Sequence, residues 1–142
     1  MSSKGAVKQI CLNTAAAFKI TCSLQSACTG CARAKSCPIE LDVTREAHLY
    51  RIAQEAVHNA ITHGRAKRIK LRLDFHSGQG KLAIQDDGVG IRRQPGGRQG
   101  MGLQTMAYRA RLIGGSLELN RPSRRGTVVT CVFPLPPAKP NP

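Results

Sequence analysis

The order of helical and strand-like segments predicts an α+β fold: a two-layer sandwich with both helices on one face of a mixed, mostly antiparallel sheet. Three observations lead to this prediction. One long segment has the apolar spacing of an amphipathic helix, a shorter helical segment follows later, and the segments around them alternate apolar and polar residues as half-buried strands do. Hairpin-like strand pairs interrupted by two helices are typical of this class.

The first third of the chain carries one predicted strand. Residues 6–16 are expected to form a short helix or the end of a longer one. Phe18–Leu24 alternates in polarity and favours β-structure, so a strand is predicted there. Residues 25–40 contain three clustered cysteines and have no clear period, which indicates a loop.

The middle of the chain predicts a long helix followed by a β-hairpin. Apolar residues between Thr44 and His63 recur at i, i+3 and i+4, and Gly64 is placed to end the helix. Ile69–Phe75 and Lys81–Asp86 alternate apolar and polar residues, which is the pattern of half-buried strands. The short glycine-containing turn between them indicates that the two strands pair.

The C-terminal part predicts a loop, a second helix and two more strands. The Gly- and Arg-rich residues 88–102 are expected to be a loop, and Leu103–Ile113 a helix ended by a Gly-Gly pair. Leu117–Asn120 and Thr127–Phe133 have the composition of strands. Residues 135–142 are rich in proline and are expected to be disordered or extended.

The charge is strongly positive, since 22 Lys and Arg against 8 Asp and Glu give a formal net charge of +14. This surplus favours a polyanionic partner, whether nucleic acid, nucleotide phosphates or an acidic protein, without choosing among them. The three Phe and two Tyr lack the spacing of a base-stacking surface, and no helix-turn-helix or zinc-finger spacing is present. Direct binding to nucleic acid is therefore not expected.

The sequence shows no sign of membrane insertion. No apolar run approaches the roughly 20 residues that a membrane-spanning helix needs. The first residues lack the apolar core of an export signal. We therefore expect a cytoplasmic domain without direct membrane contact, and this expectation is compatible with a membrane anchor in a longer parent chain.

Six cysteines in a chain of this kind favour free thiols or metal ligands over disulfides. Cys28, Cys31 and Cys37 form a tight group that contains a CxxC, and zinc would need a fourth ligand. A loop of free thiols is the favoured interpretation. The candidates for a fourth ligand are Cys11, Cys22 and His48.

A row of polar residues follows the long predicted helix. Glu55, Asn59 and His63 are spaced i, i+4 and i+8, so they lie along one side beside the apolar stripe. Carboxylate and amide oxygens suit Mg²⁺, which commonly accompanies nucleotide phosphates. A solvated helix edge, with a C-terminal His favoured by the helix dipole, would explain the same row.

Two glycine motifs offer sites for the two ends of a nucleotide. Asp86 closes a strand, and its carboxylate is suited to accept a hydrogen bond from an exocyclic amine such as that of adenine. Gly88 and Gly90 follow it and let the backbone approach a flat ligand closely, although a simple turn has the same composition. Gly100 and Gly102 lead into a helix whose free N–H groups can bind phosphate.

The loop between the two glycine motifs is cationic. It contains Arg92, Arg93 and Arg98, and we expect it to close over phosphates. The second motif is not a Walker loop, because the GKS or GKT that would follow the glycines is missing.

In combination, E-x-x-x-N on a helix, D-x-G-x-G after a strand and G-x-G-L before a helix resemble the nucleotide-binding fold shared by gyrase-type ATPases, Hsp90, histidine kinases and MutL. HLYRIAQEAVHNAITHG is similar to the N box of nitrate-sensor-like histidine kinases, and DDGVGI to their G1 box. GMGLQTMAYRARLIGGSLEL is similar to their G2 box and following helix, and GTVVTCVFP to their closing strand. The resemblance covers residues 18–134 and implies a Bergerat-type ATP-binding domain, with residues 91–101 as the ATP lid.

The resemblance also implies a role for each matching residue. Asn59 would coordinate Mg²⁺, and Glu55 would be the polarising carboxylate beside it. Asp86 would bind the adenine amine with support from Thr127. The other nucleotide-binding residues would be His63, Gly88, Gly90, Arg93, Gly100, Gly102 and Leu103.

The chain departs from the family pattern at one charged position. Many relatives carry Lys before the residue that matches His63, and here that residue is Thr62. Lys67 and Arg68 are candidates to supply the missing phosphate-facing charge. The cysteine-containing loop has no recognised counterpart.

The implied activity is that of a protein-histidine kinase. Such a kinase transfers the γ-phosphate of ATP to a histidine on an upstream dimerisation domain, works as a homodimer and passes the phosphate to a LuxR-type response regulator. None of the four histidines of this chain has that context, so we expect the phosphoacceptor to lie outside it. Residues 1–17 are the candidate end of the preceding dimerisation helix.

Two alternatives stay open at this point. An anti-sigma-factor-like serine kinase would share the same fold. A nucleic-acid-binding module would use the +14 charge instead.

Overall fold

A computed structural model describes residues 41–91, 100–122 and 125–137, and the backbone alone of residues 19–27. The order of elements agrees with the predicted one. The expected helix at residues 6–16, the clustered cysteines and most of the expected lid lie outside the described residues. The elements are β1 (Lys19–Ala27), α2 (Val43–Thr62), β2 (Arg68–His76), β3 (Gln79–Asp86), α3 (Met101–Leu112), β4 (Ser116–Asn120) and β5 (Thr127–Pro134).

The long helix α2 has a defined cap at each end. The Asp42 side chain accepts a hydrogen bond from the Arg45 amide at 2.8 Å, which satisfies an N–H that has no partner within the helix. At the other end, the amides of His63 and Gly64 both donate to the Asn59 carbonyl at 3.0 Å. The predicted glycine stop is thereby confirmed. Neither α2 nor α3 is long and apolar enough to cross a membrane.

The strands β2 and β3 form the predicted hairpin. They pair antiparallel from Ile69 opposite Asp86 to His76 opposite Gln79. The two residues between the strands, Ser77 and Gly78, have φ of 49° and 76°. Two positive φ values are what a tight two-residue hairpin turn requires, because such a turn matches the right-handed twist of the strands.

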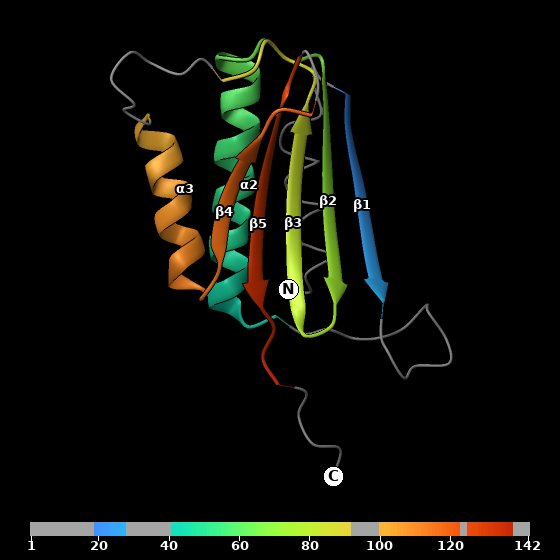
Figure 1. The fold of residues 1–142 in the computed structure, drawn as a ribbon, viewed down its shortest axis with the longest axis vertical. Helices are drawn as coiled ribbons and strands as arrows, with labels where there is room; N and C mark the ends of the chain where they lie inside the picture. The colour runs from blue at the N-terminus through green and yellow to red at the C-terminus, as the bar shows by residue number, and fades with distance from the viewer. Residues whose placement is uncertain (1–18, 28–40, 92–99, 123–124, 138–142) are drawn as a thin grey trace.

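The five strands form one mixed sheet in the order β1-β2-β3-β5-β4, in which β1 runs parallel to β2 and every other pair is antiparallel. Helix α2 packs on β2 and β3, while α3 packs on β4 and β5, as the two layers of Figure 1 show. The predicted two-layer α+β sandwich is confirmed. Its largest fully buried side chains are Phe133, Ile52, Ile69, Leu71, Leu82, Ile84, Met106, Val57 and Cys131.

The chain stays attached to the fold beyond β5. The Leu135 amide donates to the Gly78 carbonyl at 2.8 Å, and the Leu135 side chain packs against the core. The sequence placed this residue in a disordered or extended tail, because its prolines dominate the local composition. A single apolar side chain among those prolines is enough to anchor the chain here.

We predict that Gly80→Ala destabilises the sheet. A methyl group at Gly80 would overlap the ring of Phe133, which is 1% exposed and cannot move aside without disturbing the core. Overpacking of this kind costs about 1–3 kcal/mol. Urea denaturation should show this loss, whereas Lys81→Ala at the next, exposed position should change the free energy of unfolding by less than about 0.5 kcal/mol.

Candidate functional site

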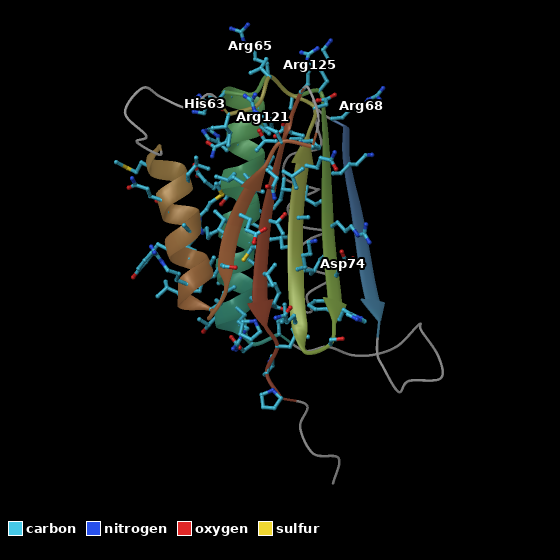
Figure 2. All side chains as sticks on the ribbon, in the orientation of Figure 1. His63, Arg65, Arg68, Asp74, Arg121 and Arg125 are labelled. Atoms are coloured by element: carbon cyan, nitrogen blue, oxygen red, sulfur yellow. The ribbon has the colours of Figure 1, made fainter. Side chains whose placement is uncertain are left out.

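The motifs that the sequence singled out meet at one end of the molecule. Helix α2 and strand β3 end there, and β2 and α3 begin there (Figure 1). The side chains of His63, Arg65, Arg68, Arg121 and Arg125 gather at the same end (Figure 2). These four arginines and His63, called the cationic rim below, lie at the same end of the domain as the predicted nucleotide-binding residues.

Glu55 and Asn59 lie against the first turn of α3. Both side chains are partly buried, on the edge of the apolar stripe of α2. A Cβ atom on Gly102 would overlap Oε1 of Glu55 and would lie 3.3 Å from Nδ2 of Asn59. The absence of a side chain at Gly102 therefore lets the Glu55 carboxylate and the Asn59 amide lie against the start of α3, and both side chains carry oxygen donors of the kind that Mg²⁺ prefers.

The start of α3 offers unpaired backbone donors at the same place. Gly100 is the N-cap residue and makes no side-chain capping hydrogen bond. The first N–H groups of a helix have no partner within the helix, and they carry the positive end of its dipole. Phosphate oxygens bind readily to such an end. Leu103, the neighbour of Gly102, is partly buried and packs against the core, so it fixes this turn on the domain.

The carboxylate of Asp86 is held at the end of β3. Its Oδ1 accepts a hydrogen bond from the Gly88 amide at 2.8 Å. Burial raises the pKa of Asp86 above the ordinary 3.8, although the hydrogen bonds from the Gly88 and Thr127 backbones act in the opposite direction. A partly desolvated carboxylate with a fixed orientation is well suited to accept a hydrogen bond from a buried amine.

The loop after Asp86 is packed tightly against the end of α2. A Cβ atom on Gly88 would overlap the carbonyl oxygen of Gly64, and the Val89 amide donates to that oxygen at 2.9 Å. Gly90 has a φ of +84°, a conformation that other residues adopt only with strain. The glycines of the D-x-G-x-G motif are thus required by close backbone contact and by conformation.

Thr127 lies beside Asp86, and its predicted support of that carboxylate stays a prediction. The two residues are opposite each other in the pairing of β3 with β5, and Thr127 is only 6% exposed. Gly126, with a φ of +91°, donates its amide to the Gly88 carbonyl at 2.7 Å, and a Cβ atom there would overlap the Asp86 carbonyl. The beginning of β5 therefore supports the Asp86 loop on the side opposite α2.

Asp87 is a structural residue that the sequence analysis did not single out. Its Oδ1 accepts hydrogen bonds from the amides of Lys67 at 2.8 Å and Arg68 at 2.9 Å, and these bonds lower its pKa. Asp87 therefore ties the loop to the beginning of β2. The partners are about 20 residues away in the sequence, so no local pattern could have indicated them.

Arg121 is the second residue that sequence reasoning missed. It follows β4, and its Nη2 donates to the carbonyl of Ile91 at 3.0 Å. Its guanidinium also lies beside Gly90, where a Cβ atom would be 3.1 Å from Nη2. Arginines are frequent in this chain, and composition alone did not distinguish this one from the others.

Of the remaining candidate site residues, His63 is described by the structure and Arg93 is not. His63 is the C-cap residue of α2, its amide donates to the Asn59 carbonyl, and its exposed side chain makes no hydrogen bond within the described part of the chain. Arg93 lies outside the described residues, as do Arg92 and Arg98. Its expected contact with phosphate stays a prediction.

The alternative of a zinc site finds no support in the described part of the chain. Among those residues no group of three or more His, Cys, Asp or Glu could hold a metal ion. The Nδ1 atom of His48, one candidate ligand, lies 3.4 Å from Nη1 of Arg109 between the two helices. Cys28, Cys31 and Cys37 themselves lie outside the described residues.

The family of histidine kinase-, DNA gyrase B- and HSP90-like ATPases matches residues 44–137, which contain every site element described above. The chain belongs to this family. The sensor histidine kinase MctS of Rhizobium johnstonii is 35% identical over 89 residues, and the nitrate/nitrite sensor protein NarQ of Escherichia coli is 35% identical over 98 residues. The ATP-binding domain of PrrB from Mycobacterium tuberculosis has the same fold, with a TM-score of 0.69 at 22% identity over 96% of each chain.

This ATPase-family domain is much shorter than the relatives it matches in sequence. The match with MctS covers 61% of this chain and 19% of MctS, and the match with NarQ covers 67% of this chain and 17% of NarQ. The chain thus spans less than a fifth of either relative. Their activities as whole proteins depend on parts that these matches do not cover.

We predict that Gly102→Ala weakens binding of Mg²⁺–ATP without weakening the fold. The added methyl group would overlap the Glu55 carboxylate and crowd Asn59. Alanine nevertheless favours a helix over glycine by about 0.5–1 kcal/mol. Calorimetric titration should therefore show a lower affinity, whereas thermal melting should show a higher melting temperature. Gly100→Ala adds a methyl group at the same helix start without the overlap, because a Cβ atom there meets nothing within 4 Å, so it should lower the affinity less than Gly102→Ala, and an equal loss in both variants would contradict the prediction.

We also predict that ADP binding depends on the ionisation of Asp86. Because the folded pKa of Asp86 is raised, lowering the pH should protonate it, and weaken binding, before an ordinary carboxyl with a pKa of 3.8 would respond. Asp86→Asn should cost about 1.5–3 kcal/mol of binding free energy at neutral pH, the strength of a charged hydrogen bond. In this variant the affinity for ADP should no longer fall as the pH is lowered through the pKa of Asp86. If Asp86→Asn keeps the wild-type pH dependence of ADP binding, Asp86 is not the group whose ionisation controls binding.

Acid should affect the stability of the domain through Asp86 in the direction opposite to its effect on nucleotide binding. A carboxyl whose pKa is raised on folding binds its proton more tightly in the folded state. At neutral pH the buried carboxylate is ionised, and its desolvation lowers the free energy of unfolding by the full amount. This cost disappears as the pH falls through the folded pKa and the carboxylate is protonated. Acid should weaken nucleotide binding while the contribution of Asp86 to the free energy of unfolding becomes more favourable.

Proposed function

We propose that this chain is the ATP-binding catalytic domain of a sensor histidine kinase. In this proposal it binds Mg²⁺–ATP and presents the γ-phosphate to a histidine on a dimerisation domain outside the chain. The phosphate then passes to a LuxR-type response regulator, and the complete kinase acts as a homodimer in the cytoplasm. Membership of the ATPase family and the similarity to MctS and NarQ support the proposal.

One observation carries the proposal: two groups of candidate nucleotide ligands lie against α2 and the residues that follow it. Near its end, α2 presents Glu55 and Asn59 to the glycine-rich start of α3, and Gly64, just after its C-cap, contacts the loop that follows Asp86. Oxygen donors and helix N–H groups suit a metal-bound phosphate chain, while the desolvated carboxylate suits an amine-bearing base. An ATP molecule has both parts, joined by a ribose.

The residues present fit a Mg²⁺ ion carried by the nucleotide. The Glu55 carboxylate and the Asn59 side-chain amide both lie against Gly102, where a Cβ atom would overlap Oε1 of Glu55, so two oxygen-bearing side chains meet the start of α3. Asn59 would coordinate the ion through its side-chain oxygen, and Glu55 would polarise the groups around it. When bound, the ion would neutralise charge on the phosphates, which is the main requirement of phosphoryl transfer together with positioning.

The chain itself supplies the other contacts. In the proposal, Asp86 accepts a hydrogen bond from the adenine amine, with Thr127 behind it, and Gly88 and Gly90 lie beneath the base. His63 faces the phosphates. Lys67 and Arg68 offset the charge missing at Thr62 in this proposal, and Arg68 lies at the same end of the domain as His63 (Figure 2). Residues 91–101 are proposed as the lid, on the strength of their sequence alone.

We predict that Asn59→Ala separates phosphotransfer from binding. In the full-length kinase this variant should lose autophosphorylation, because the ion that neutralises the phosphates loses a ligand. Metal-free ADP should still bind, since Asp86 and its loop are untouched. A radiolabel transfer assay and an ADP titration in the presence of a chelator measure the two properties.

His58→Ala is a suitable control for this experiment, because His58 precedes Asn59 on α2 but is exposed. It should keep both properties. If Asn59→Ala loses metal-free ADP binding as well, the residue maintains the fold, and its assignment to the metal is wrong. If the wild-type chain binds no adenine nucleotide at millimolar concentration, the proposed function itself fails.

A further inference from the structure

We propose that Arg121 determines base specificity by positioning: it holds the segment from Asp86 to Ile91 so that the Asp86 carboxylate faces the amine of adenine. The inference rests on the proposed function, in which Asp86 binds that amine. Arg121 acts through the loop and is a positioning residue.

The guanidinium of Arg121 makes a bridge between two parts of the chain that are 30 residues apart. Its Nη2 donates to the Ile91 carbonyl at 3.0 Å. A Cβ atom on Gly90 would lie 3.1 Å from Nη2 and 3.2 Å from Nε, so the planar group lies against bare backbone. A guanidinium combines a charge-assisted hydrogen bond with a flat surface, and the ammonium of a lysine cannot reproduce both.

These contacts are linked to Asp86 through Gly88. The Asp86 carboxylate takes its orientation from the Gly88 amide at 2.8 Å, and the Gly88 carbonyl is held by the Gly126 amide at 2.7 Å. Arg121 and Gly126 both belong to the connection from β4 to β5. This connection therefore holds the loop at Gly88 and again at Ile91, and the loss of the second contact would free the path of the backbone between them.

Arg125 is the control that distinguishes a positioning effect of Arg121 from an effect of its charge. It lies in the same β4–β5 connection, carries the same charge and is exposed at the same end of the domain (Figure 2). Within the described part of the chain it makes no hydrogen bond to the Asp86 loop. Any attraction of a nucleotide to the cationic rim should be weakened equally by loss of Arg121 or Arg125.

The experiment compares the dissociation constants of ATP and inosine triphosphate for wild type, Arg121→Ala and Arg125→Ala. Inosine triphosphate has a carbonyl oxygen in place of the amine, so it offers Asp86 no donor at that position of the base. We expect wild type to prefer ATP, and Arg121→Ala to lower this preference about tenfold, the equivalent of one charge-assisted hydrogen bond. Arg125→Ala should weaken both nucleotides alike and leave the preference unchanged.

The outcomes distinguish the role of Asp86 from that of Arg121. If wild type binds ATP without preferring it over inosine triphosphate, the proposed role of Asp86 fails, and the inference on Arg121 fails with it. If wild type prefers ATP and a folded Arg121→Ala retains the full preference, only the Arg121 inference is overturned. Thermal melting without nucleotide reports whether the variants are folded.

Arg121→Lys keeps the test decisive if the alanine variant does not fold. Lysine retains the charge and one donor but not the planar group that covers Gly90. Its preference for ATP should fall between those expected of wild type and of the alanine variant. If Arg121→Lys prefers ATP as strongly as wild type does, only the charge of Arg121 matters, and the inference is overturned.

Discussion

The arrangement of the site depends on the close approach of three backbone segments at Gly88. This residue is too near the Gly64 carbonyl to bear a side chain, and its own carbonyl accepts the Gly126 amide. The end of α2, the end of β3 and the beginning of β5 are thereby fixed relative to one another. The Asp86 carboxylate is held by the Gly88 amide, so its direction follows from this backbone contact. A methyl group at this point would have to displace backbone atoms, which are much harder to move than the end of a side chain.

Acidic residues are scarce in this basic domain, and their environments differ according to what they bind. Asp42 caps α2 and Asp87 binds two amides at the start of β2, and hydrogen bonding lowers the pKa of both. Asp86 is the opposite case, because burial dominates and raises its pKa. A solvated carboxylate that accepts hydrogen bonds from the protein contributes to stability, whereas one that is desolvated by burial is poised to accept a ligand. The pKa directions thus separate the structural acids from the one proposed to bind the base.

The sequence predicted the elements of the fold because each depends on local periodicity. The polar row of α2, the strand ending at Asp86 and the glycine stop at Gly64 are all visible within a few residues. Family resemblance then selected candidate site residues, and those that the structure describes lie toward one end of the domain, while their roles stay predictions. The contacts of Asp87 with β2 and of Arg121 with Ile91 could not be predicted, since they join segments 19–30 residues apart and depend on the register of the sheet.

Helix α2 links the two halves of the site as a rigid spacer. Asn59 on its flank faces the proposed metal and phosphate side, and Gly64, at its end, contacts the loop that carries Asp86. Asn59 lies four positions before the C-cap His63, which corresponds to roughly 6 Å along a helix axis, and Gly64 follows directly. The opposite side of α2 is buried in the core, with Ile52 and Ala53 completely covered, so the helix cannot shift without disturbing the sheet. The spacing between the phosphate side and the base side is therefore set by the same packing that stabilises the domain, and a nucleotide that binds here does not have to organise it.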